Sequence, residues 1–297
     1  MVSDAPDTRT RTATRLLKSS AQLSYDPVVH IDWAAPLEPD RLFVPAHRCS
    51  LYGTPMWDGL TPGQQVELSK HEVASLASIG IWFETILMQM LVRHAYHRDP
   101  TTADIQYAFT EIGDETRHSI MFGKLIKRLH APYYQPPRHM HWLGAAFKTL
   151  SNGPLTFGGT LFVEEILDQL QREAMADESV QPLVRAVNRV HVVEEARHMA
   201  YAREENAIAW DQLGPIERRW TQFVLGGVAY YTAVGMVNPR VYAQVGLRPR
   251  EAYAVAQANP HWRESRKWAA RKAVATLDEV GMIGGPGRWL WRKAGLV

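Results

Sequence analysis

The sequence predicts an all-α fold, in which a bundle of four long helices is joined by additional peripheral helices. Long segments with apolar residues at helical spacing alternate with short breaks of Pro, Gly and Asn. The alternation of apolar and polar residues that marks a half-buried strand is nearly absent. The chain of 297 residues is 46% hydrophobic and 22% charged. This composition is typical of a globular protein with a large core.

The N-terminal part of the chain is expected to lead into the bundle. Residues 1–23 are rich in Arg and Thr and predict a tail with a short helix. This stretch lacks the apolar core of a secretory signal. Residues 24–58 are rich in Pro, Asp and aromatic residues and predict an extended segment packed on the bundle. We therefore expect one domain over residues 24–297, with its core at about 60–210.

The first two long helices have clear start signals. Thr61 is the expected N-cap and Pro62 the first residue of a helix that runs to about residue 97. Thr101 or Thr102 opens a second helix, which runs to about residue 130.

The rest of the chain divides at its prolines and glycines. The prolines of APYYQPPRHMHW (131–142) exclude a regular helix over that stretch, and NGP (152–154) and LGP (213–215) are further breaks. The helices expected between and after these breaks lie at about 140–150, 155–176, 181–211, 216–236 and 261–280, followed by a Gly/Pro turn at 284–287.

Composition also argues against several partners. The formal net charge is +2, so there is no general reason to expect nucleic acid or an anionic membrane as a partner. Cys49 is the single cysteine, which excludes an internal disulfide and CxxC motifs. No uninterrupted apolar window reaches about 18 residues, so no transmembrane span is expected, and we expect a cytoplasmic protein.

The segment HVVEEARH (191–198) places three candidate metal ligands on one helix face. His191, Glu195 and His198 are spaced i, i+4 and i+7, and residues at these positions stack on an α-helix. Imidazole and carboxylate together are the usual ligand set for iron, manganese or zinc. A charged, solvated helix face is the alternative interpretation, so matching ligands elsewhere in the chain decide between the two.

Matching candidates occur on the other long helices. Glu115 and His118 in DETRH (114–118) form the one other ExxH pair in the sequence, on the second predicted helix. Glu84 lies in an apolar stripe of the first helix, where a carboxylate is costly to bury unless it is metallated, paired or protonated. The third helix offers Glu164 and Glu165. The stripe through Glu165 is the more polar, so Glu164 is the expected inward residue.

This pattern is that of the di-metal carboxylate site in ferritin-like bundles, with one Glu from each of two helices and one ExxH from each of the others. Iron and manganese suit such ligands. Ligating histidines usually donate their second N–H to a carboxylate, and Asp114 and Glu194 are the candidates, each reaching the histidine on the opposite helix. Arg117 and Arg197 would then balance their charge; surface ion pairs are the alternative.

His191 adds a third histidine to the common two-histidine site, and Glu111 holds the equivalent position on the second helix. With this third histidine, the chain resembles the p-aminobenzoate N-oxygenase (AurF-like) family of di-iron oxygenases, whose signature reads Glu … ExxH … Glu … HxxxExxH. The 27-residue step from Glu164 to His191 is also similar to the family's spacing. The seven residues that carry the resemblance are Glu84, Glu115, His118, Glu164, His191, Glu195 and His198.

The resemblance implies a non-haem di-iron monooxygenase of secondary metabolism, with two iron ions, O₂ as co-substrate and an external reductase. Its relatives oxidise aryl amines to hydroxylamine, nitroso and nitro products through a peroxo-di-iron species. It implies a small-molecule substrate, an amine above all, and a homodimer. Manganese or a mixed Mn/Fe pair would satisfy the same ligands.

Other functions stay open on the residues alone. A ferritin-like hydroxylase or oxidase that acts on carbon would use the same ligands, as would a radical-generating protein with Tyr107 near the metals. An iron-storage protein usually has a shorter bundle. A carboxylated substrate would need a cation such as Arg266 or Arg271, although a solvated basic face is the favoured interpretation of that helix. The aromatic candidates for a pocket wall beside the metals, with core packing as the alternative, are Trp82, Phe83, Phe157, Tyr230 and Tyr231.

Overall fold

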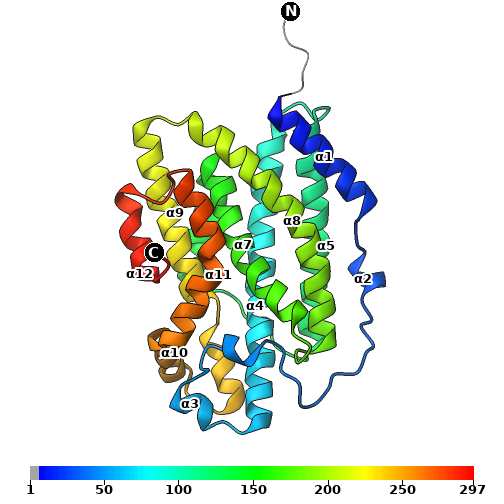
Figure 1. Cartoon of the computed structure of the whole chain (residues 1–297), viewed down its shortest axis with the longest axis vertical. Coiled ribbons are helices and arrows are strands. Elements are labelled where there is room, and N and C mark those ends of the chain that lie inside the picture. The colour runs from blue at the N-terminus through cyan, green and yellow to red at the C-terminus, as the bar shows by residue number, and fades with distance from the viewer. Residues whose placement is uncertain (1–6) are drawn as a thin grey trace, which may run out of the picture.

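The computed structural model describes residues 7–297, and the first six residues of the predicted N-terminal tail lie outside this range. The predicted all-α fold is confirmed (Figure 1). Within residues 7–297, the one β-bridge is an isolated contact between Leu42 and Val180.

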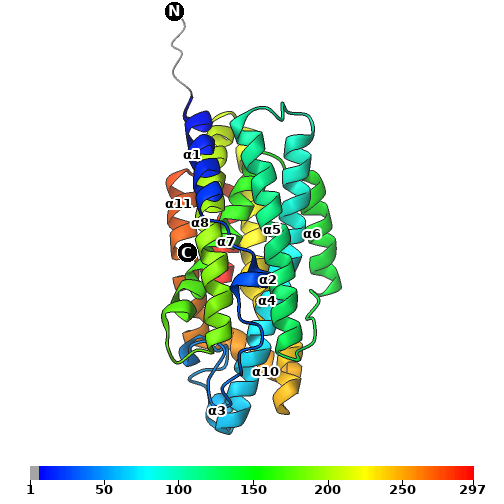
Figure 2. The same cartoon turned by 90° about the vertical axis from the view of Figure 1, so that its right-hand side faces the viewer.

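Four long helices form the bundle that the sequence predicts. They are α4 (Pro62–Tyr96), α5 (Ala103–Arg128), α7 (Pro154–Ala176) and α8 (Pro182–Asp211). α4 packs along α5 and α7 packs along α8, and the four run side by side in both views (Figures 1 and 2).

Local signals explain where these helices begin. Thr61 caps α4 as expected: its side chain accepts from the Gln64 N–H, and the Gln64 side chain accepts from the Thr61 N–H. Pro62, Pro154 and Pro182 lie in the first turns of α4, α7 and α8, where a missing N–H costs no hydrogen bond.

The N-terminal segment lies against the outer side of α5 and α8. Helix α1 (Thr8–Gln22) is capped by the Asp7 side chain and packs on both helices (Figure 2). The short helices α2 (Pro27–His30), η1 (Ala46–Arg48) and α3 (Pro55–Asp58) interrupt the otherwise extended lead-in.

The peripheral helices cover α4 and α7. α6 (Arg138–Leu150) packs on α4, whereas α9 (Pro215–Gly235) and α11 (Pro260–Glu279) pack on α7. Three further elements were not predicted as helices, since each is short: η2 (Pro239–Val245), α10 (Pro249–Ala258) and α12 (Arg288–Ala294). The expected Gly/Pro turn is the 3₁₀ turn η3 (Gly285–Gly287).

Among the described residues, α4 alone is long and apolar enough to cross a membrane. In the structure, however, 56% of its most apolar stretch is buried against the rest of the chain. It also carries the fully buried carboxylate of Glu84. We therefore interpret α4 as a core helix, and a cytoplasmic location stays a prediction.

Candidate metal centre

Six of the seven candidate ligands form two close donor groups at one level of the bundle, and the seventh, Glu164, lies beside Glu195 and Glu115. Each of their side chains is at most 2% exposed. Two overlapping groups have one donor atom per residue, and within each group all donor atoms lie within 4.8 Å of one another. The first group is Glu84, His118, His191 and Glu195; the second is Glu115, His118, Glu195 and His198.

The two ExxH pairs face each other across the bundle. The Nδ1 of His118 lies 3.1 Å from Glu115 Oε2 on its own helix and 3.3 Å from Glu195 Oε1 on α8. The Nδ1 of His198 lies 3.1 Å from Glu195 Oε1 and 3.0 Å from Glu115 Oε1. Since i and i+3 share a helix face, each helix presents both donors of its pair together.

The extra histidine extends this layer toward α4. His191 Nε2 lies 3.3 Å from Glu84 Oε1 and 3.6 Å from Glu195 Oε1. The three histidine rings are close to one another: the centroids of His118 and His191 are 4.5 Å apart and those of His118 and His198 are 5.8 Å apart.

The structure separates the two glutamates of α7. Glu164 points to the ligand layer, where the proximity of Glu195 and Glu115 contributes to its raised pKa. Glu165 instead forms an ion pair with Arg203 of α8. Glu164 is therefore the residue available to a metal.

The carboxylate oxygens of the ligand layer are suited to bind cations. One carboxylate oxygen on each of Glu84, Glu115, Glu164 and Glu195 is buried and has no hydrogen-bond partner in the described protein. Buried polar atoms are nearly always satisfied, and an ionised carboxylate can only accept. Four such carboxylates beside three imidazoles therefore fit two divalent cations, which would balance the charge and satisfy the oxygens.

Crowding also perturbs the protonation of these carboxylates. Burial and the neighbouring Glu115 raise the pKa of Glu84, and burial with Glu195 and Glu115 raises the pKa of Glu164. For Glu115, burial would raise the pKa, but nearby His198 and hydrogen bonds lower it well below the usual range. Cations that bind here would therefore displace protons.

Two further carboxylates hold the histidines from the outer side. The Nε2–H of His118 donates to Glu194 Oε2 at 2.9 Å, and that of His198 donates to Asp114 Oδ2 at 3.1 Å. Both contacts run to the opposite helix. They make Nε2 the outer donor of each ring and turn Nδ1 toward the ligand carboxylates, which is the orientation that a metal requires.

Cations and the N-terminal segment complete this outer side. Arg117 pairs with Asp114 and lies 3.8 Å from Glu194, while Arg197 lies 3.7 Å from both carboxylates. The backbone N–H of Tyr25 also donates to Glu194 Oε1 at 3.0 Å. Sequence reasoning missed this last contact, because a backbone N–H in an irregular segment leaves no residue pattern.

Among the other residues considered from the sequence, Glu111 lies beside the ligand layer. It is 1% exposed, burial and the neighbouring Glu115 and Glu195 raise its pKa, and its Oε2 has no partner in the described chain. Like Glu164, it belongs to neither donor group. The solvated face predicted for Arg266 is wrong: the side chain is buried and donates to Ala233 O and Gln257 Oε1. Arg271 is exposed.

The aromatic residues proposed as pocket wall pack in other directions. None of the five lines the cavity found beside the ligand layer. The Trp82 ring packs against Gly144 of α6, and Phe157 contacts the rings of His94 and Tyr201. Tyr230 and Tyr231 contact each other on α9.

Comparison with known proteins agrees with this geometry. The family model described as p-aminobenzoate N-oxygenase AurF matches residues 6–281. The chain belongs to the p-aminobenzoate N-oxygenase family. The predicted resemblance is thus confirmed, and membership supports an oxygenase. The chain is 26% identical over 291 residues to uncharacterized proteins of Mycobacterium bovis (Mb0909) and Mycobacterium tuberculosis (Rv0885), which covers 93% of this chain and 84% of each relative.

Proposed function

We propose that this member of the p-aminobenzoate N-oxygenase family is a di-iron monooxygenase that oxidises an amine at nitrogen. One observation carries the proposal: seven buried Glu and His side chains lie together in the bundle, with carboxylate oxygens that have no partner in the described protein. The family description supplies the reaction class.

The residues of the chain have distinct parts in this proposal. The ligand glutamates neutralise the cations, and Asp114 and Glu194 fix the tautomers of His198 and His118. Two bound iron ions would supply the reducing centre at which O₂ is activated. The buried, largely apolar surroundings exclude water, which protects a reactive oxygen species from unwanted reactions.

The oxidation of an amine by O₂ also needs electrons from a separate donor. We propose a reductase as that donor and an amine as the small-molecule substrate. A homodimer, a role in secondary metabolism, and manganese in place of one or both irons stay predictions.

The test combines metal analysis with product analysis. The purified chain, reconstituted with iron(II) under nitrogen, is expected to bind about two irons, as two-metal sites do. With an aryl amine, a chemical reductant and ¹⁸O₂, mass spectrometry should detect a hydroxylamine that contains ¹⁸O. If iron binds but ¹⁸O is found only on carbon of the product, carbon hydroxylation replaces the proposed N-oxygenation. If no metal binds, the di-iron proposal is overturned.

A radical-generating protein is the second candidate because of Tyr107. Its side chain is fully buried, its hydroxyl has no partner in the described chain, and it lies near enough to His198 to affect the pKa of that imidazole. A tyrosyl radical in the electron paramagnetic resonance spectrum after O₂ exposure, absent from Tyr107→Phe, would favour this candidate. If neither the parent chain nor Tyr107→Phe shows a tyrosyl radical, the radical-generating candidate is excluded.

A further inference from the structure

A cavity lies inside the bundle directly beside the ligand layer. Each of the four long helices contributes a wall residue one helical turn from its proposed ligand. These residues are Gly80, Phe122, Leu167 and Asn188. The Phe122 ring lies 4.9 Å from the His191 ring, so the cavity begins where the metal site ends.

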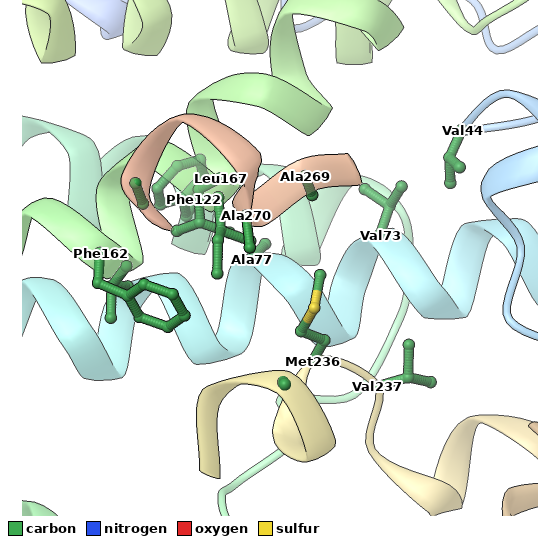
Figure 3. Close-up of a cluster of buried hydrophobic side chains, with 14 of the residues drawn as sticks. Val44, Val73, Ala77, Phe122, Phe162, Leu167, Met236, Val237, Ala269 and Ala270 are labelled. Atoms are coloured by element: carbon green, nitrogen blue, oxygen red, sulfur yellow. The ribbon is translucent and has the colours of Figure 1, made fainter. Parts of the chain in front are cut away.

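The cavity extends away from the ligands through apolar surroundings. Figure 3 shows part of its wall, in which Val73, Ala77, Phe122 and Leu167 lie in one cluster with Val44 of the lead-in. Its volume is about 70 Å³. An apolar cavity of about 150 Å³ holds a benzene ring, so a single ring enters here only if side chains of the wall move, and a larger ring system would need still larger movements.

The charges on the wall are already paired. Arg48 and Glu72 are the charged side chains among the wall residues. Arg48 donates to both oxygens of Glu173, from Nε at 2.6 Å and from Nη2 at 3.0 Å. Its Nη1 donates to Ser265, and its guanidinium lies 3.8 Å from the centroid of the Trp268 ring.

Glu72, the second charged side chain of the wall, is an acid and is also paired. Glu72 accepts from the backbone N–H of Ser50 at 3.1 Å and from its hydroxyl at 2.5 Å. Arg48, Glu173 and Glu72 together therefore carry no net positive charge. A carboxylate that entered the cavity would lose its water and find no unpaired cation, which is costly.

We infer that this cavity is the substrate site, and that it takes an uncharged aryl amine with a single ring and no carboxylate. The amine would face the ligand layer and the ring would lie against Ala77 and Phe122. This inference rests on the proposed function and narrows it, because it separates the substrate of this chain from the aminobenzoate in the family description.

The test is binding rather than turnover. The full chain, loaded with iron(II) under nitrogen, is titrated by calorimetry with p-toluidine and with p-aminobenzoate, which differ in the group opposite the amine. We expect p-toluidine to bind at least about tenfold more tightly, which corresponds to about 1.4 kcal/mol. Equal or tighter binding of p-aminobenzoate would overturn the inference, and so would the failure of both amines to bind to iron-loaded protein.

Two pairs of variants locate the site. Ala77→Leu should fill the cavity and weaken p-toluidine binding at least about tenfold without loss of iron, whereas Ala146→Leu on the exposed face of α6 should not. Glu173→Gln should free Arg48 and strengthen p-aminobenzoate binding at least about tenfold, a gain that Arg48→Met in the same chain should abolish. Unchanged affinities in folded, iron-loaded Ala77→Leu or Glu173→Gln would place the binding elsewhere.

These results separate the inference from the proposed function. Metal content and ¹⁸O incorporation are measured on the same preparation. A chain that binds iron and oxidises an amine, but prefers p-aminobenzoate, would retain the function and lose the inference. Amine binding without any bound iron would overturn the proposed function and leave the cavity as a binding site for an uncharged amine, not as a substrate site.

Discussion

On the side that faces Tyr25, the ligand layer is backed by charges: Asp114 and Glu194 accept from the histidines and are themselves paired with Arg117 and Arg197. On the side that faces Val44, one helical turn away, it is backed by Phe122 and other apolar residues around a cavity. The same four helices build both sides.

The difference shows how one bundle serves two tasks: it orients the metal-binding imidazoles on one side and leaves space beside them on the other. Charged hydrogen bonds hold the imidazoles in one orientation and leave little room, since each acceptor is already engaged. On the cavity side, Phe122 packs against the His191 ring through apolar contact, and space is left beside it. Changes on the outer side should therefore alter metal affinity, and changes on the cavity side should alter stability and amine binding.

The largest effect is expected from a substitution in the ligand layer itself, which lies between the two sides. Glu195 belongs to both donor groups, so Glu195→Ala should remove most of the bound iron and all oxygenase activity. Metal analysis after gel filtration measures this loss, with Glu264→Ala on the exposed face of α11 as the matched control. Two irons per chain in Glu195→Ala would contradict the ligand assignment.

On the cavity side, Phe122→Ala should lower the free energy of unfolding by about 3–5 kcal/mol, the usual cost of removing a buried phenyl ring. Phe122 is 3% exposed and packs against Gly80 and His191. Chemical denaturation gives the value, with the half-exposed Phe109→Ala as control. A large loss of iron from Phe122→Ala while stability holds would break the comparison between the two sides.

Glu72 on the same side predicts a pH dependence of stability. Burial raises its pKa from 4.5 to about 7, against the effect of the hydrogen bonds from Ser50. The unfolded chain thus releases this proton near pH 4.5, while the folded chain keeps it to about pH 7. Glu72 should therefore reduce stability as pH rises through this window, by up to about 3 kcal/mol.

Glu72→Gln isolates this contribution. The variant should gain stability relative to the parent chain between pH 4.5 and 7, as measured by urea unfolding across that range. Cys49 and Tyr242 also face Glu72, but burial raises the pKa of both, so they stay neutral there. A constant difference between the two proteins at every pH would contradict the raised pKa.

On the outer side, Asp114→Asn and Glu194→Gln should each weaken iron binding by about 10–100-fold, because the histidines lose the carboxylates that orient them. Stability of the metal-free chain should change less than in Phe122→Ala. Competition with a coloured chelator measures the affinity, and Asp211→Asn at the exposed end of α8 is the control. Unchanged affinity in both variants would make these contacts ordinary ion pairs.

Much of this protein follows from local rules that a sequence states directly. The i, i+3 and i+4 spacing placed Glu115 with His118 and Glu195 with His198, because helix geometry is set within a few residues. Thr61 and the prolines marked helix starts for the same reason. Comparison of stripe polarity also favoured Glu164 over Glu165, and Glu165 indeed pairs with Arg203.

Tertiary structure alone decided which groups meet across the fold. Arg48 and Glu173 are 125 residues apart, and Tyr25 and Glu194 are 169 apart, so no local pattern foretells either pair. The burial of Arg266 in a basic-looking helix and the position of the cavity belong to the same class. The reason is physical: spacing along one helix fixes which side chains share a face, but the partner of each face, and hence whether a charge is free or paired, depends on how the helices pack.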